Sequence, residues 1–152
     1  MRLRPSGRQG PVATSVQSFR DYQMTEAWTW EHLALTRARV VALAGEGAEA
    51  LARDVEALRL SVLRGRGTDA RVMPDLADMR ERIFAARPLD GVWEAKVGPG
   101  RLQDIDLLAQ SLALRTGEPA RGTLAQLRAG RRAGLITAVD ADKLGSIWRF
   151  LW

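Results

Sequence analysis

The sequence predicts a nearly all-α protein, arranged as an antiparallel helical bundle. Three observations favour this fold class. Apolar residues recur at three- and four-residue spacing in most segments of the 152-residue chain. The same segments are rich in alanine, leucine and arginine, which favour helix. Glycine and proline gather in short stretches between them, and short connections place successive helices antiparallel.

The first residues predict a short strand that ends almost at once. Arg2 and Arg4 flank a leucine, so in an extended chain both arginines point to one face. Pro5 cannot donate a ladder hydrogen bond, and Ser6 before a glycine suits a turn. We therefore expect residues 1–14 to be the remnant of a core whose last strand begins this chain.

Helices are expected throughout the remaining domain, residues 15–152. Ser15 is a suitable N-cap for a first short helix. The clearest long helix is expected from Glu26 to about Leu43, a stretch without glycine or proline. Further helices are expected at about 48–63, from Pro74 to about residue 87, and at 102–115, 123–133 and 139–151, with a loop at 64–67 and an extended segment at 92–97.

The composition limits the environment and the partners. The absence of cysteine excludes disulfides and thiolate metal sites, and it fits a cytoplasmic protein. No apolar run is long enough to cross a membrane, so we expect no membrane partner. The net charge of +5 permits nucleic acid, nucleotide or acidic protein partners. Nearly every basic residue is arginine, however, and a GC-rich coding sequence produces the same bias without any charged partner.

Two tryptophans mark the expected long helix. Trp28 and Trp30 point about 200° apart around a helix, so they cannot share a face. We expect both in the core; a base-stacking platform is the alternative. The only histidine, His32, is expected to pack or to orient a neighbour. Glu31 is expected to pair with nearby arginines.

These residues belong to a wider resemblance. The stretches that carry it are residues 2–7 (RLRPSG), 21–23 (DYQ), 26–32 (EAWTWEH) and 34–41 (ALTRARVV). They resemble the glutamine synthetase adenylyltransferase/adenylyl-removing enzyme family, and the tryptophan motif is closer to its adenylylating half. A second block, from Lys96 to Leu107, resembles the family's lysine, proline-glycine-glycine and aspartate-isoleucine-glutamate-phenylalanine pattern. It departs from that pattern at Arg101, Asp106 and Leu107.

The resemblance implies a function for the parent protein. The family transfers AMP from ATP to a tyrosine of glutamine synthetase, with magnesium held by carboxylates. Its metal-binding aspartate directly precedes the arginine-leucine-arginine-proline stretch, so the resemblance implies that the metal ligands precede Met1. We accordingly expect no catalytic or metal-binding residue in this chain, no tight binding of ATP or magnesium, and no activity of the chain alone.

The resemblance also implies site residues. Those implied to face the phosphates of ATP are Arg2, Arg4, Ser6, Arg37, Arg39 and Lys96; those implied to support them are Trp30, Glu31, Asp104 and Asp106. Simpler interpretations stand beside these. Arg37 and Arg39 suit an exposed helix face equally well, and the aspartates suit the first turn of a helix, where the dipole favours anions.

Three hypotheses follow. The first is a segment of an adenylyltransferase-like enzyme, whose partners are glutamine synthetase and the remainder of the parent enzyme. The second is a helical module that binds glutamine synthetase or another partner without catalysis, and that self-associates through an exposed apolar surface. The third is a small nucleic-acid binder, which we do not expect because the arginines are scattered over several helices.

Overall fold

The computed structural model describes residues 13–86, 91 and 93–152 of the chain. All regular structure in this part is helical, which confirms the all-α prediction. The helices are α1 (Val16–Thr25), α2 (Thr29–Leu35), α3 (Ala48–Arg66), α4 (Val72–Ala86), α5 (Leu102–Thr116), α6 (Thr123–Arg132) and α7 (Ala138–Leu151). The strand expected at the start of the chain, with Arg2, Arg4 and Ser6, lies outside the described residues.

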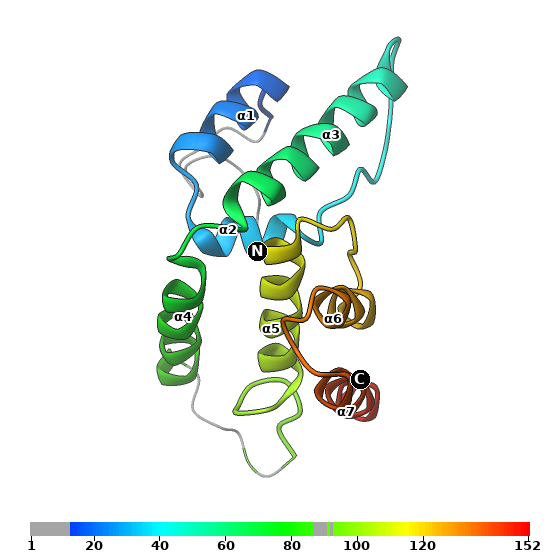
Figure 1. Cartoon of the computed structure of the whole chain (residues 1–152). Helices are drawn as coiled ribbons and strands as arrows, with labels where there is room; N and C mark the ends of the chain where they lie inside the picture. The colour runs from blue at the N-terminus through cyan, green and yellow to red at the C-terminus, as the bar shows by residue number, and fades with distance from the viewer. Residues whose placement is uncertain (1–12, 87–90, 92) are drawn as a thin grey trace.

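Helix α5 is the centre of the fold (Figure 1). It contacts α2, α3, α4, α6 and α7. Helices α4 and α5 run antiparallel side by side, while α6 and α7 cross α5 on its other side (Figure 1). None of the helices in the described ranges is both long enough and apolar enough to cross a membrane.

The apolar core has two parts, one on each side of α5. The first joins α2, α3 and α4 around residues such as Leu33, Val62 and Leu76. The second joins α5, α6 and α7 around Ile105 and Leu127. This division follows from the sequence of α5, where eight residues are buried and face neighbours on several sides.

The prediction of one long helix from Glu26 to Leu43 is wrong. The chain turns after α1, and α2 occupies only Thr29–Leu35. Trp28 precedes it in an extended conformation, with φ −82° and ψ 159°, and its N–H donates to Glu31 Oε2 at 3.0 Å. The prediction that Trp28 belongs to the core is also wrong, because its side chain is 69% exposed.

The C-terminal end of α2 has a physical cause. In a continued helix, the carbonyls of Thr36 and Ala38 would accept from backbone N–H groups four residues later. Here they accept from the guanidinium groups of Arg59 and Arg121, at 3.1 and 2.9 Å. The chain then continues without helix until α3.

The other boundaries need smaller corrections. The prediction of a loop at 64–67 is wrong, because α3 continues through Arg66. The helix is about one turn longer than the apolar spacing of the sequence predicted. The described part of the expected extended segment, residues 93–97, is a loop in which the Glu94 carboxylate accepts from the N–H groups of Lys96 and Val97. The helices α5, α6 and α7 agree with the predicted ranges to within a residue or two.

Candidate functional site

Two residues of the tryptophan motif, Glu31 and His32, are buried at the corner between α1 and α2. Glu31 is 1% exposed, and both its carboxylate oxygens accept from the Tyr22 hydroxyl at 2.9 Å. Within the described ranges its partners are this tyrosine and the Trp28 N–H, where an arginine had been expected. Glu31 therefore fixes the turn that positions α2. Trp30, the other expected supporting residue, is half-buried beside α4.

His32 packs and orients, as the sequence indicated. Its side chain is buried, and Nε2 lies 3.0 Å from the Gln23 carbonyl oxygen. Because a carbonyl oxygen can only accept, Nε2 carries the proton. Burial lowers the pKa of His32 below its ordinary value of 6.5, so the ring is neutral at pH 7. His32 thus links α1 to α2 and does not act as a cation.

Asp106 connects four elements of the fold. Its Oδ2 accepts from Arg37 Nη1 at 3.2 Å, just beyond α2. Its Oδ1 accepts from the Thr123 hydroxyl at 2.6 Å and from the Trp148 indole N–H at 2.9 Å. Arg37 nevertheless keeps 45% of its side chain exposed, so its remaining N–H groups are open to a ligand.

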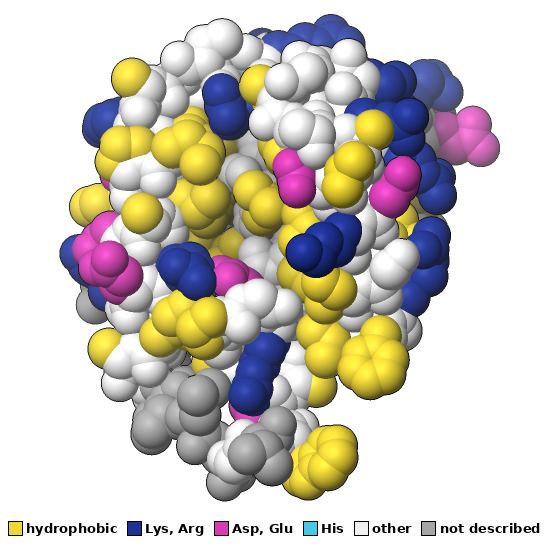
Figure 2. Space-filling model, turned by 60° about the horizontal axis from the view of Figure 1, so that its bottom comes forward, with side chains coloured by type: hydrophobic (Ala, Val, Ile, Leu, Met, Phe, Trp, Pro, Cys, Tyr) yellow, Lys and Arg dark blue, Asp and Glu magenta, His cyan; other side chains and the backbone are white. Residues whose placement is uncertain are grey.

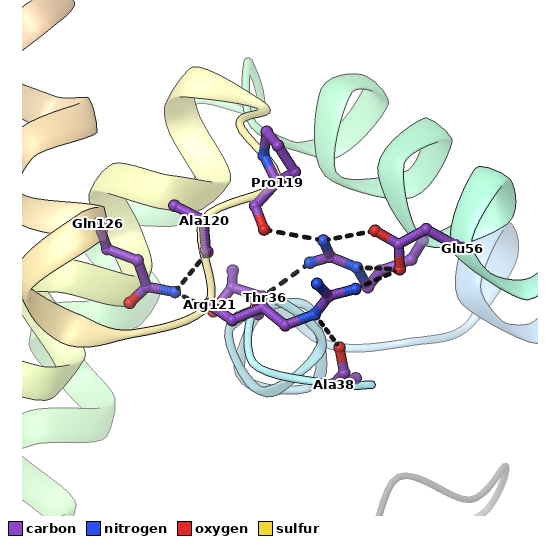
Figure 3. A network of polar contacts seen from close by, with 8 residues as sticks. Thr36, Ala38, Glu56, Pro119, Ala120, Arg121 and Gln126 are labelled. Atoms are coloured by element: carbon purple, nitrogen blue, oxygen red, sulfur yellow. Dashed lines mark hydrogen bonds and ion pairs between the residues drawn. The ribbon is translucent and has the colours of Figure 1, made fainter. Parts of the chain in front are cut away.

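A polar network centred on the buried Arg59 holds the chain on either side of Arg37 (Figure 3). Arg59, which is 2% exposed, donates to both Glu56 oxygens at 2.9 and 3.0 Å and to the carbonyls of Thr36 and Pro119. Arg121 donates to Glu56 Oε2 at 2.6 Å and to the carbonyl of Ala38. The Arg59 guanidinium lowers the pKa of the Glu56 carboxyl, which stays charged at neutral pH.

Gln126 completes this network from α6. Its amide nitrogen donates to the Thr36 hydroxyl at 3.2 Å and to the Ala120 carbonyl at 3.1 Å (Figure 3). The sequence analysis missed all the network side chains on α3 and α6. One signal was present: Arg59 follows Val55 by four residues and adjoins Leu58, so it falls on the apolar face of α3. An arginine on such a face needs buried partners.

In the described ranges, the remaining expected site residues make no hydrogen bond or ion pair with Arg37. Asp104 pairs with Arg80 of α4 and accepts from the Gly100 N–H at 2.9 Å, which is a role at the helix start. Lys96 is exposed in the loop before α5, and Arg39 is exposed beyond α2. Within the described ranges, neither basic side chain has an ion-pair partner.

The described part of the site offers guanidinium donors and no cluster of metal-binding side chains. Among the residues that the structure describes, no three His, Asp or Glu side chains gather closely enough to hold a metal ion. The carboxylates of the buried Glu31 and the half-buried Asp106 each accept from neutral or cationic donors of the protein. What the chain presents is therefore an exposed, oriented guanidinium, which suits an oxyanion.

Comparison with known proteins extends these observations. The family model for glutamate-ammonia ligase adenylyltransferase matches residues 1–54. A bifunctional glutamine synthetase adenylyltransferase/adenylyl-removing enzyme of Rhizobium meliloti (strain 1021) is 44% identical over 151 residues, which cover 93% of this chain and 15% of the relative. The protein of the same name from Rhodopseudomonas palustris (strain HaA2) is 43% identical over 149 residues, with 95% and 15% covered.

A third relative shows the same partial overlap. The bifunctional enzyme of Bradyrhizobium diazoefficiens is 49% identical over 114 residues, which cover 75% of this chain and 11% of the relative. The similarity thus extends well past the family model, through α3 and into the helices that follow. The chain spans about 15% of the length of the first two relatives.

Proposed function

Because the chain belongs to the glutamine synthetase adenylyltransferase/adenylyl-removing enzyme family, we propose that it is the phosphate-facing helical segment of a nucleotidyltransferase. The parent reaction in this proposal transfers AMP from ATP to a tyrosine of glutamine synthetase. Magnesium would be held by carboxylates elsewhere in the parent protein, because the described residues do not fit a metal site. The proposal therefore assigns only phosphate binding to this chain.

One observation supports the proposal most directly. Arg37 belongs to the ALTRARVV stretch and Asp106 to the second block of the resemblance, 69 residues later, and the two meet in an ion pair at 3.2 Å. Asp106 orients Arg37 while leaving nearly half of the side chain open. An oriented guanidinium can donate two parallel hydrogen bonds to a phosphate group. In this proposal Arg37 contacts ATP, and the resemblance implies that Arg39, Lys96, Arg2 and Arg4 also face its phosphates.

A chimaera tests this function. This chain would replace the matching segment of the Rhizobium meliloti relative, and AMP transfer from labelled ATP to glutamine synthetase would be measured. We expect the chimaera to be active and Arg37→Gln to reduce kcat/KM by about tenfold or more. Arg53→Gln, an exposed residue of α3, is the control of equal charge change. An Arg37→Gln chimaera as active as this control would contradict the phosphate role.

A second candidate function rests on a different observation. The segment after α2 has no helix although it is rich in helix-forming residues, and Val41 in it is 82% exposed. Val40 and Val41 of this segment and Phe19 of α1 line a groove of about 320 Å³. Exposed apolar surface of this kind marks a protein contact. We propose that, if the chain lacks any catalytic role, it is a helical module that binds glutamine synthetase or another protein here.

The two candidates separate experimentally. Binding of the purified chain to glutamine synthetase would be measured with wild type and with Val41→Ser. The interaction module predicts binding that Val41→Ser weakens, with no need for ATP. If immobilised glutamine synthetase retains neither the wild-type chain nor Val41→Ser, the interaction module is excluded. The chimaera experiment tests the phosphate-binding function separately, and its result does not depend on this one.

A further inference from the structure

A groove of about 270 Å³ runs between α6 and α7. Three arginines line it: Arg128 and Arg131 from α6, and Arg149 from α7. Its floor includes the buried residues Leu127 and Ala141. Figure 2 shows Lys and Arg side chains gathered down the side of the molecule where Figure 1 places these two helices.

The positive charge of this groove is largely uncompensated. Among the described residues of its lining, Asp142 is the only acidic one, and its Oδ1 lies 3.9 Å from Arg131 Nη1. At that distance the two side chains form an ion pair but no hydrogen bond, so the N–H groups of Arg131 do not donate to Asp142. In the described ranges, Arg128 and Arg149 have no ion-pair partner. Three cations facing one carboxylate repel one another unless an anion joins them.

Gly145 lines the groove beside Arg149. A Cβ added there would lie 3.4 Å from Leu124 Cδ2 and 4.0 Å from Arg149 Nη1. The Arg149 guanidinium therefore folds over the glycine, close to the floor of the groove, and does not extend away from the protein. The hydroxyl of Ser146 already donates to the Asp142 carbonyl at 3.0 Å, which leaves the guanidinium groups as the donors of the groove.

We propose that the α6–α7 groove binds a phosphate-type anion. Guanidinium groups match phosphate oxygens through paired hydrogen bonds, and three of them from two helices can surround one such group. The volume suits a small anion such as pyrophosphate. This site is distinct from Arg37 and does not rest on the proposed adenylyl transfer.

Calorimetric titration of the 152-residue chain with inorganic pyrophosphate tests the proposal. We expect saturable binding of one anion per chain at moderate salt. The double variant Arg128→Gln/Arg149→Gln should bind at least about tenfold more weakly. The double variant Arg20→Gln/Arg53→Gln has the same net charge and changes exposed residues of α1 and α3, so it should bind as wild type does.

A second measurement locates the site without changing any charge. Amide chemical shifts of Gly145 and Ser146, which line the groove, should move on titration with pyrophosphate. Three outcomes would overturn the proposal. They are the absence of saturable binding, an equal loss in the control double variant, and binding of a glutamate-rich peptide in place of pyrophosphate.

Discussion

The Asp106 carboxylate on α5 accepts a hydrogen bond of 2.9 Å from the Trp148 indole N–H on α7, 42 residues later in the chain. The same oxygen accepts from the Thr123 hydroxyl of α6. A single carboxylate therefore joins the helices of the second core cluster to the end of α2, where Arg37 lies. The residue that orients the proposed phosphate ligand also helps to hold the last two helices in place.

Replacing this carboxylate should destabilise the protein. Asp106→Asn removes the charge and turns one acceptor into a donor that faces other donors. Hydrogen bonds to charged groups contribute about 1.5–3 kcal/mol each, so we expect a loss of about 2 kcal/mol in the free energy of unfolding, measured by urea denaturation. Asp54→Asn, at an exposed position of α3, is the matched control and should change the free energy by less than about 0.5 kcal/mol.

The buried Arg59 should matter more than any exposed arginine. Arg59→Met keeps the length of the side chain but leaves the carbonyls of Thr36 and Pro119 without donors, and it removes one of the two arginines from Glu56. Leaving a buried acceptor such as the Thr36 carbonyl without its donor costs about 1–3 kcal/mol, and Glu56, which is 35% exposed, keeps Arg121 as a partner, so we expect a loss of about 2 kcal/mol by urea denaturation. Arg53→Met, on the exposed side of the same helix, should be nearly neutral; a similar loss there would mean that the network is not the cause.

Sequence reasoning succeeded where structure is decided locally. The N-cap at Ser15, whose side chain accepts from the Ser18 N–H, follows from the residue type. The positions of α5, α6 and α7 follow from apolar spacing and from the glycine- and proline-containing stretches between them. It failed at the end of α2, because the arginines that bind the Thr36 and Ala38 carbonyls lie 23 and 83 residues away. No local pattern records a partner at that distance.

The same difference between local and long-range contacts applies to the candidate site. The resemblance identified Arg37 and Asp106, and the structure brings them together. It did not identify the Glu56 network that holds the backbone beside Arg37, since buried ion pairs depend on tertiary packing. The phosphate-facing roles given to Arg39 and Lys96 remain predictions, and Arg2, Arg4 and Ser6 lie outside the described residues.

His32 should make stability depend on pH. It is the only histidine, and burial lowers its pKa in the folded protein below the ordinary value of 6.5. The unfolded chain therefore binds a proton more readily, so the stability that neutral His32 provides is complete above pH 6.5 and is lost as pH falls through the folded pKa. We expect the urea midpoint to fall between about pH 7.5 and about pH 5.5.

A variant separates this effect from other titrations. His32→Gln does not titrate, and its amide N–H can still donate to the Gln23 carbonyl. Its urea midpoint should be the same at both pH values, even if it is lower than that of wild type at neutral pH. A midpoint that falls equally in both proteins would assign the pH dependence to groups other than this histidine.

Gly67 should tolerate no side chain, because it lies where α3 ends against the C-terminal end of α5. A Cβ there would lie 2.0 Å from the Leu114 carbonyl oxygen, which belongs to the backbone and cannot turn aside. Gly67→Ala should therefore destabilise the protein by about 2 kcal/mol or more.

Gly65, two residues earlier in α3, is the matched control, since nothing lies within 4 Å of its added Cβ. Because alanine favours helix more than glycine does, Gly65→Ala should stabilise the protein by up to about 1 kcal/mol, and thermal unfolding of the two variants should give shifts of opposite sign. Equal shifts would show that α5 does not approach α3 as closely as the structure places it.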